Sequence, residues 1–206
     1  MLIDYLEDNY ERTTPIFVSD IQYENRSRSW LYKQLALLCA QGKLCKFDKG
    51  VYYLPEMNRL GFNKILSSYA VAEKKYIGEE ENTIGYYSGI TLLNSLGLTT
   101  QMAGTVTICT NKQKTRKRMV DVGNARIILR KPRTTVDSYN VNTMRLLDVV
   151  TDLPEYELSK DDNVKRIISF MKIQSIKSED IKNMVGFYPD VTSKKLIQCG
   201  LIFMIK

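Results

Sequence analysis

Clusters of basic side chains are the feature of this sequence that most clearly suggests chemistry. Residues 24–49 hold six lysines and arginines against two acidic residues, and residues 111–118 hold five with no acidic residue among them. Cations at this density favour binding to a polyanion, above all to nucleic-acid phosphates. The alternative is that both clusters are ordinary solvated surfaces. We expect DNA contacts from Asn25, Arg26, Ser27, Arg28, Ser29, Tyr32, Lys33, Lys46 and Lys49, and a second contact from Lys112, Lys114, Arg116, Lys117 and Arg118.

The remaining composition argues against catalysis and metal binding. The chain of 206 residues has no histidine, so it lacks the most common general base, and no spacing suggests a pair of acid–base carboxylates. The four cysteines form no C-x-x-C pair, so we expect no metal, no structural disulfide and no cofactor. The formal net charge of +7 fits a polyanionic partner. We therefore predict a protein that is not an enzyme.

The stretch "GYYSGITLLNSLGLTTQ", from Gly85 to Gln101, places a glycine between an expected strand and an expected helix. Such a turn can cradle a phosphate on free backbone N–H groups. A phosphate loop requires more glycines and usually a lysine, and this stretch has neither. We instead expect Ser88 to cap the helix and Gly97 to end it in the left-handed conformation. The stretch is interpreted as part of the fold.

The first sixty residues predict a DNA-binding domain. Apolar spacing indicates a helix from Leu2 to Tyr10, a second, shorter helical element from Ser19, and a third helix from about Arg28 to Gln41. A hairpin follows, with strands at 44–47 and 51–54. Three short helices and a ribbon in this order are typical of a winged helix-turn-helix, whose third helix lies in the major groove. Tyr32 either contacts the sugar-phosphate backbone or covers the wing. We assign residues 1–57 to this domain.

Residues 62–206 are expected to form a second domain. We predict a helix over about 63–75, strands at 105–109, 119–122 and 126–129, and later helices at about 144–150, 164–171, 178–186 and after residue 189. Ser159 and Asp162 resemble a capping box, and residues 201–205 are expected to form a terminal strand or a buried tail. The fold class is thus α+β: an N-terminal winged helix-turn-helix followed by a mixed α/β domain with helices late in the chain.

Several segments together resemble the AbiEi family of bacterial antitoxins. They are "GVYYLP" at 50–55, the stretch 85–101, "VTICTN" at 106–111, "LRKP" at 129–132 and "LLDVVTDLP" at 146–154. The resemblance covers roughly residues 10–160. It implies an N-terminal winged helix that represses its own operon by binding promoter DNA, expected to carry inverted repeats, and a C-terminal antitoxin domain. The implied functional partner is a nucleotidyltransferase toxin of the AbiEii type. The pair would form a type IV toxin–antitoxin system for abortive infection against phage, with no stable complex required.

Two other classes of protein remain as alternatives. One is an enzyme whose central block binds a nucleotide, and the other is a stand-alone winged-helix transcription factor whose second domain senses a ligand or a protein. No apolar run approaches the ~20 residues of a membrane helix, and the acidic, amphipathic N-terminus is unlike a secretory signal peptide. We therefore expect a cytoplasmic protein with no membrane partner.

Overall fold

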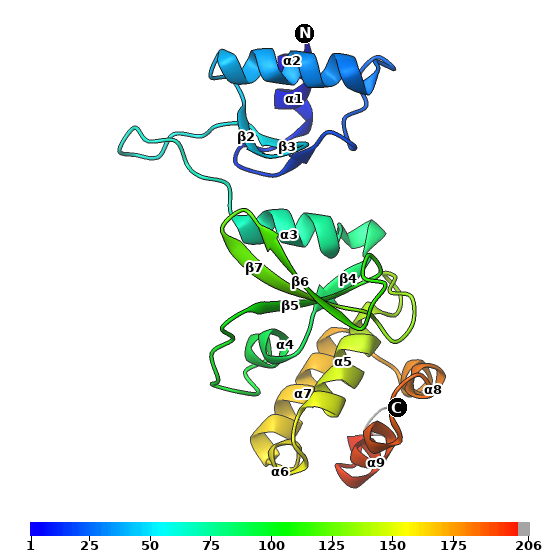
Figure 1. The fold of residues 1–206 in the computed structure, drawn as a ribbon. Coiled ribbons are helices and arrows are strands. Elements are labelled where there is room, and N and C mark those ends of the chain that lie inside the picture. Colours follow the sequence, from blue (N-terminus) through cyan, green and yellow to red (C-terminus); the bar gives the residue numbers. More distant parts are fainter. Residues whose placement is uncertain (202–206) are drawn as a thin grey trace. The chain divides into compact units, whose positions relative to one another are not determined.

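In a computed structural model, residues 1–201 are described and pack into two compact units (Figure 1). The first unit consists of Met1–Lys74 together with Val122–Ala125, and the second consists of Lys75–Asp121 and the residues from Arg126 onward. Helices and strands occur in both units, which confirms the α+β class. The expected domain limits at 57 and 62 both fall inside the first unit.

The core of the first unit combines two helices with a three-stranded antiparallel sheet in the order β1-β3-β2. Apolar residues of both helices and of the sheet form one core, which includes Leu6, Ile16, Leu35 and Leu54. The elements are α1 (Leu2–Asn9), β1 (Ile16–Phe17), α2 (Arg28–Ala40), β2 (Cys45–Asp48) and β3 (Val51–Tyr53). The predicted first helix, third helix and hairpin are confirmed.

Local sequence fixes helix α2 at both ends. The Ser27 hydroxyl accepts a hydrogen bond from the N–H of Trp30 at 3.3 Å, which satisfies one of the free amides of the first turn. Gly42 follows the helix with φ +71°, the left-handed conformation that glycine adopts without strain. The buried side of the helix consists of Leu31, Leu35 and Leu38.

The predicted helical element from Ser19 is wrong. Residues 18–27 form turns and irregular chain, and Asn25 has φ +52°, which is incompatible with a right-handed helix. The Tyr23 ring stacks on the Trp30 ring with centroids 5.9 Å apart. Aromatic packing, together with turn hydrogen bonds such as that from the Arg26 N–H to the Tyr23 carbonyl at 2.9 Å, holds the segment that leads into α2.

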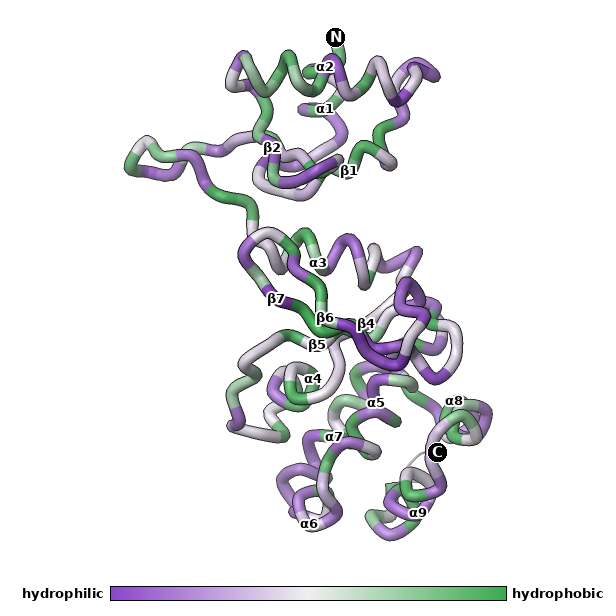
Figure 2. The backbone as a smooth tube through the Cα atoms, in the orientation of Figure 1, coloured by the Kyte–Doolittle hydropathy of each residue, from purple (hydrophilic) through white to green (hydrophobic). Residues whose placement is uncertain are grey.

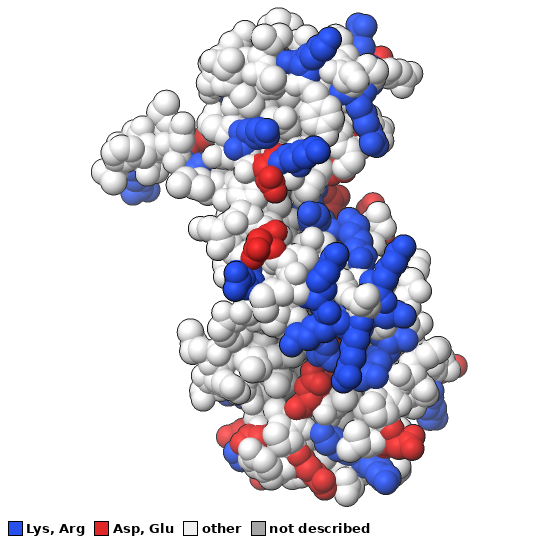
Figure 3. All heavy atoms as spheres, in the orientation of Figure 1, with Lys and Arg blue, Asp and Glu red and all other residues white. Residues whose placement is uncertain are grey.

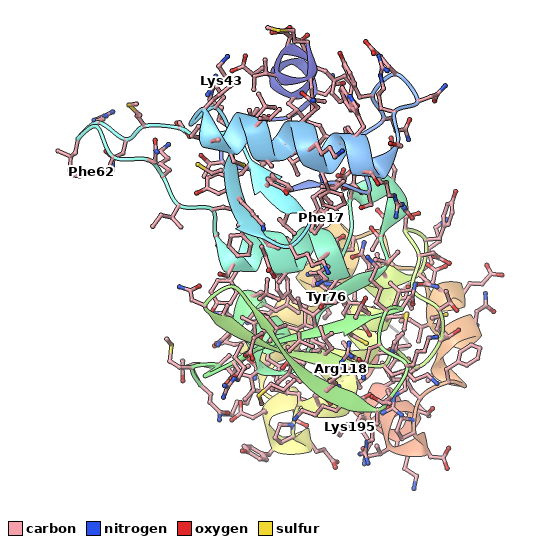
Figure 4. The ribbon with its side chains drawn as sticks, turned by 45° about the horizontal axis from the view of Figure 1, so that its top comes forward. Phe17, Lys43, Phe62, Tyr76, Arg118 and Lys195 are labelled. Atoms are coloured by element: carbon pink, nitrogen blue, oxygen red, sulfur yellow. The ribbon has the colours of Figure 1, made fainter. Side chains whose placement is uncertain are left out.

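A hairpin loop, called the arm below, comprises residues 55–66. The Asn58 carbonyl side-chain oxygen accepts hydrogen bonds from the N–H groups of Leu60 and Phe62, at 2.9 and 3.0 Å. The Lys64 N–H donates to the Glu56 carbonyl at 2.7 Å, which closes the base. Apolar residues recur along the arm (Figure 2), and Phe62 lies at its outer end (Figure 4).

The second unit contains a four-stranded mixed sheet in the order β4-β5-β7-β6. Strands β4 and β5 pair antiparallel, whereas β5 and β7 pair parallel, with Val106 opposite Ile127. Gly123, at φ +56°, makes the turn between β6 and β7. The strands are β4 (Gly85–Tyr87), β5 (Val106–Thr110), β6 (Lys117–Val122) and β7 (Ala125–Arg130), which confirms the expected strands.

Helix α5 (Val141–Asp152) is the central helix of the second unit. It contacts β4, α4, α8 and α9, and its Met144, Leu147 and Val150 are fully buried. The other helices are α3 (Ser68–Tyr76), which begins in the first unit, η1 (Glu80–Asn82), α4 (Ile90–Ser95), α6 (Glu155–Leu158), α7 (Asp161–Ile173), α8 (Ser178–Val185) and α9 (Asp190–Gln198).

Two expected helix starts differ from the structure. Helix α3 begins at Ser68 rather than near residue 63, because the preceding residues form the returning side of the arm. Helix α7 has Lys160 at its N-cap, and the Ser159 hydroxyl donates instead to the Glu155 carbonyl at 2.9 Å. The expected tail at 201–205 lies outside the described residues except for Leu201, which is buried.

The role expected for Ser88 is also wrong. The N-cap of α4 is Gly89, with φ +61°, and the Ser88 hydroxyl points into the core, where it donates to Asp148. Gly97, at φ +66°, does end the helix, and the N–H of Leu98 donates back to the Leu93 carbonyl as predicted for such a stop.

A buried lysine closes the carboxyl end of α5. Lys195 of α9 is 8% exposed, and its Nζ donates to the carbonyls of Val150, Thr151 and Leu153 at 3.1, 3.0 and 2.7 Å (Figure 4). The last carbonyls of a helix have no partner within the helix, and a cation there also complements the helix dipole. Lys195 therefore ties α9 to α5.

We predict that Lys195→Met lowers the free energy of unfolding by about 1–3 kcal/mol, because the aliphatic stem is kept while three buried carbonyls lose their donor. Urea unfolding followed by circular dichroism measures this loss. Lys194→Met, on the exposed side of the same helix, is the matched control and should change stability by less than about 0.5 kcal/mol. Equal losses in the two variants would contradict the capping role.

Candidate nucleic-acid interface

The first turns of α2 expose the side chains that a DNA-reading helix requires. Arg28, Ser29 and Lys33 are all solvent-exposed, and within the described residues no carboxylate pairs with Arg28 or Lys33. Asn25 and Ser27 lie exposed just before the helix, where free backbone N–H groups and the helix dipole favour an anion. This end of α2 therefore presents uncompensated positive charge.

Arg26 is placed differently from the other expected contacts. Its guanidinium pairs with the Glu24 carboxylate at 3.0 Å and lies 5.2 Å from the centre of the Trp30 ring. The hydrogen bond from Arg26 holds the pKa of Glu24 below its ordinary value. Arg26 thus supports the aromatic packing ahead of α2, and its charge is already compensated.

The β2–β3 hairpin supplies two more exposed cations, Lys46 and Lys49. Its turn is stabilised by the Asp48 carboxylate, which accepts from the Lys49 N–H at 2.7 Å. The Tyr32 hydroxyl packs against the same turn, since a Cβ atom added at Gly50 would lie 3.3 Å from it. Tyr32 therefore covers the hairpin, while 41% of its surface remains exposed.

A second basic surface lies in the other unit, over the loop before β6 and the start of that strand (Figure 3). No carboxylate among the described residues forms an ion pair with any of its expected members. Those members are Lys112, Lys114, Arg116, Lys117 and Arg118, all solvent-exposed, with Arg118 at the front of the sheet in Figure 4.

Polar contacts give this second surface a defined shape. The Asn111 side chain makes two hydrogen bonds with the backbone of Val136, at 2.8 and 2.9 Å. The side chain of Gln113 is buried and donates to the Thr115 carbonyl at 2.8 Å. The Lys112 Nζ donates to the Lys75 carbonyl at 2.8 Å, so it also anchors the loop.

Two basic residues of the same surface were missed in the sequence. The Lys131 N–H donates to the Arg116 carbonyl at 3.2 Å, which places Lys131 beside the loop. Arg133 follows, exposed, with its guanidinium 5.8 Å from the Tyr188 ring centre. The sequence signal that could have found them is the run of Arg130, Lys131 and Arg133 at the end of an expected strand.

A buried carboxylate network, also missed in the sequence, lies behind the sheet. Asp148 of α5 accepts hydrogen bonds from the hydroxyls of Tyr86 and Ser88, at 3.1 and 2.8 Å. Arg130 donates to the Ser88 hydroxyl and to the Asp152 carboxylate, both at 3.1 Å. The network joins β4, β7, α5 and the loop that leads into α4.

The electrostatics of this network favour a structural role. Burial raises the pKa of the Asp148 carboxyl, although the Ser88 hydrogen bond and the charge of Arg130 act in the opposite direction. Burial also raises the pKa of the nearby Cys109 thiol to about 12, so the thiol is uncharged and a poor nucleophile. Ser88 has no exposed surface, so no substrate reaches it.

A wide groove of about 1030 Å³ lies where the ends of α4, α5, α6 and α7 meet. Its charged lining mixes both signs, and Lys160 on the groove pairs with Glu157 at 2.6 Å. This mixture gives the groove no preference for a polyanion. The charged members are Asp152, Glu157, Lys160, Asp161, Asp162, Lys165 and Arg166.

Comparisons with known proteins do not assign the chain to a family. No protein-family model matches the chain, and no curated protein matches it significantly. In the described part of the chain, no group of three or more histidine, cysteine or acidic residues is arranged to hold a metal ion. No helix within residues 1–201 has the length and apolar character needed to cross a membrane.

The raised pKa of Asp148 predicts a specific pH dependence. When a carboxyl has a higher pKa in the folded state than in the unfolded state, its ionisation lowers the free energy of unfolding. This loss is complete above the folded pKa and disappears as the pH falls. The amide of Asp148→Asn carries no charge at any pH. The free energy of unfolding of Asp148→Asn minus that of the wild type should therefore be highest at neutral pH, and it should fall in mild acid.

Urea unfolding at several pH values, followed by circular dichroism, checks this expectation. Trp30 is the single tryptophan and lies in the first unit, so its fluorescence reports separately on that unit. Asp121→Asn, at an exposed carboxylate paired with Arg126, is the control and should show little such trend. A stability difference between the wild type and Asp148→Asn that does not change with pH would refute the buried-charge account.

Proposed function

We propose that this protein is a DNA-binding repressor of its own operon, and that it also counteracts a nucleotidyltransferase toxin of the AbiEii type. The first unit acts as a winged helix, and the second unit supplies the antitoxin function. The protein is not an enzyme, binds no cofactor and works in the cytoplasm. The observation that carries the DNA-binding part is the set of exposed, unpaired cations on α2 and on the β2–β3 hairpin.

The order of elements in the first unit supports a winged helix. Helix α2 is followed directly by the antiparallel β2–β3 hairpin, and β1 pairs with β3 on the other side. The place of the usual second helix is taken by the turns at 18–27. In such a domain α2 inserts its first turns into the major groove, and the hairpin follows the phosphate backbone.

Charge distribution separates base reading from backbone binding. Arg28, Ser29 and Lys33 lie where a recognition helix meets base edges, and an arginine there can form two hydrogen bonds with guanine. Lys46 and Lys49 on the hairpin reach only phosphates. Arg26, whose charge Glu24 compensates, contributes to the shape of the site more than to its charge.

The antitoxin part of the proposal rests on the resemblance of residues 10–160 to the AbiEi family. The second basic surface lies within this stretch, and its exposed cations can bind nucleic-acid phosphates. We propose that this surface adds a second contact with the promoter DNA. No stable complex with the toxin is required.

A stand-alone transcription factor is the second candidate. The wide groove in the second unit favours it, because a cleft of about 1030 Å³ is large enough for a small effector molecule. The gene next to this one distinguishes the two candidates: a neighbouring nucleotidyltransferase gene supports the antitoxin.

We predict that Arg28→Ala weakens binding to the promoter upstream of the gene by about 1–3 kcal/mol and relaxes its sequence preference. Lys46→Ala and Lys49→Ala should weaken binding to all sequences alike. Each should also reduce the slope of log affinity against log salt by about one unit. Fluorescence anisotropy over a salt series, with the promoter and a scrambled duplex, measures these effects.

The control for these variants is Arg126→Ala, which removes an exposed arginine already paired with Asp121. It should leave both affinity and salt slope nearly unchanged. Replacement of Arg116 and Lys117 by glutamine tests the second surface, and a smaller salt slope is expected. Unchanged affinity in both Arg28→Ala and Lys33→Ala would exclude α2 as the recognition helix.

We predict that the second unit is required to protect cells from the toxin. Co-expression of a neighbouring nucleotidyltransferase with residues 1–60 alone should give no rescue of growth, whereas the full chain should restore it. Arg28→Ala in the full chain is the matched comparison, because it should impair repression and leave rescue intact. Full rescue by residues 1–60 would place antitoxicity in the first unit and overturn this assignment.

A further inference from the structure

The arm exposes an unusual concentration of apolar surface. Met57, Leu60, Phe62 and Ile65 are 72%, 80%, 68% and 85% exposed, although all four lie within the short segment 57–65. Single exposed apolar residues are normal, but a continuous group of them marks a binding surface. The hydrogen bonds of Asn58 and the closed base fix the shape of the arm, so little conformational entropy is lost when it binds.

Charge on the arm argues against a polyanionic partner. Lys64 pairs with Glu56 at 2.6 Å, which neutralises the base, and Arg59 is the one further charged residue within the arm. DNA-binding segments of this length carry several cations. The arm is therefore suited to an apolar protein surface.

A matching surface exists in the same unit. An open groove of about 320 Å³ runs between α1 and α2, and its lining includes Leu2, Trp30 and Leu38 together with polar and charged side chains. Leu37 at the groove is 54% exposed. The arm of the same chain points away from the body of the unit, with Phe62 at its outer end (Figure 4), so it does not fill this groove.

We propose that the arm of one copy inserts into the α1–α2 groove of a second copy, and that the exchange is reciprocal. Every copy then offers one arm and one groove, so two copies satisfy each other in a closed two-fold dimer. Leu60 and Phe62 enter the groove, while Met57 and Ile65 pack at its edge near Leu37. This proposal stands independently of the DNA-binding function.

The area involved is sufficient for a stable dimer. Four apolar side chains at these exposures hide on the order of 100 Å² each, or about 400 Å² for one arm. Leu2 and Leu38 in the groove are already buried, so the groove loses less area than the arm, and two reciprocal contacts bring the total to roughly 1,000 Å², the least that a specific interface buries.

Sedimentation velocity of the full chain over a range of concentrations tests the proposal. The wild type should be a dimer at micromolar concentration, and Phe62→Glu and Leu37→Glu should each weaken dimerisation at least tenfold. Both sites are exposed, so the circular dichroism spectrum should remain that of the wild type. Met102→Glu, at an 87% exposed residue of the second unit, is the matched control and should dimerise normally.

A mixing experiment separates reciprocal exchange from other contacts. Phe62→Glu keeps an intact groove, and Leu37→Glu keeps an intact arm, so an equimolar mixture contains one complete arm–groove contact per pair. The mixture should form heterodimers at concentrations where each variant alone is monomeric.

Three results would overturn the proposal. The first is a wild-type protein that is monomeric at all concentrations. Weaker DNA binding by Phe62→Glu in such a monomer would assign the arm to DNA instead. The second is a dimer that neither variant disturbs. The third is loss of dimerisation in both variants without recovery on mixing, which would show that the arm and the groove do not contact each other.

Discussion

The buried carboxylate of Asp148 is the constraint on which the second unit depends. A charge in a protein interior is tolerated only where donors surround it, and Asp148 receives hydrogen bonds from Tyr86 and Ser88. Ser88 in turn accepts from Arg130, so one carboxylate sets the positions of β4, the loop before α4, and β7 relative to α5. The same arginine begins the segment that continues into the second basic surface.

The basic residues fall into two groups by the compensation of their charge. Arg26, Arg130 and Arg126 each pair with a carboxylate, that of Glu24, Asp152 and Asp121 respectively. Arg28, Lys33, Lys46 and Lys49 have no such partner in the described residues, and neither do the cations of the second surface. Uncompensated cations at adjoining positions repel one another and lower stability. On the proposed function, promoter DNA supplies the anion that relieves this repulsion.

Periodic, local signals in the sequence were sufficient for much of this fold. The leucines of α2, the turn at Gly50 and the alternating strands predicted their elements, because each rests on neighbouring residues. The errors arose where distant contacts decide. Ser88 has the chemistry of an N-cap, yet Asp148, sixty residues away, takes its hydroxyl. The segment from Ser19 has a good cap residue, but it forms turns and irregular chain, and Tyr23 beside it stacks on Trp30. The cations of both surfaces were visible in the sequence, whereas the pairing of Arg26 was not.

On the proposed DNA-binding role, one copy of the first unit offers little sequence information. Beyond Lys33, the exposed residues of α2 include Ala36, Leu37 and Ala40, which cannot make specific hydrogen bonds with base edges. Two or three reading side chains, at about 1–3 kcal/mol each, barely reach the roughly 4–10 kcal/mol that separates specific from non-specific binding. A second copy doubles the number of readers and matches the two-fold symmetry of inverted repeats. The limited reading surface of α2 and the apolar arm of the same unit therefore lead to one requirement: two copies must act together.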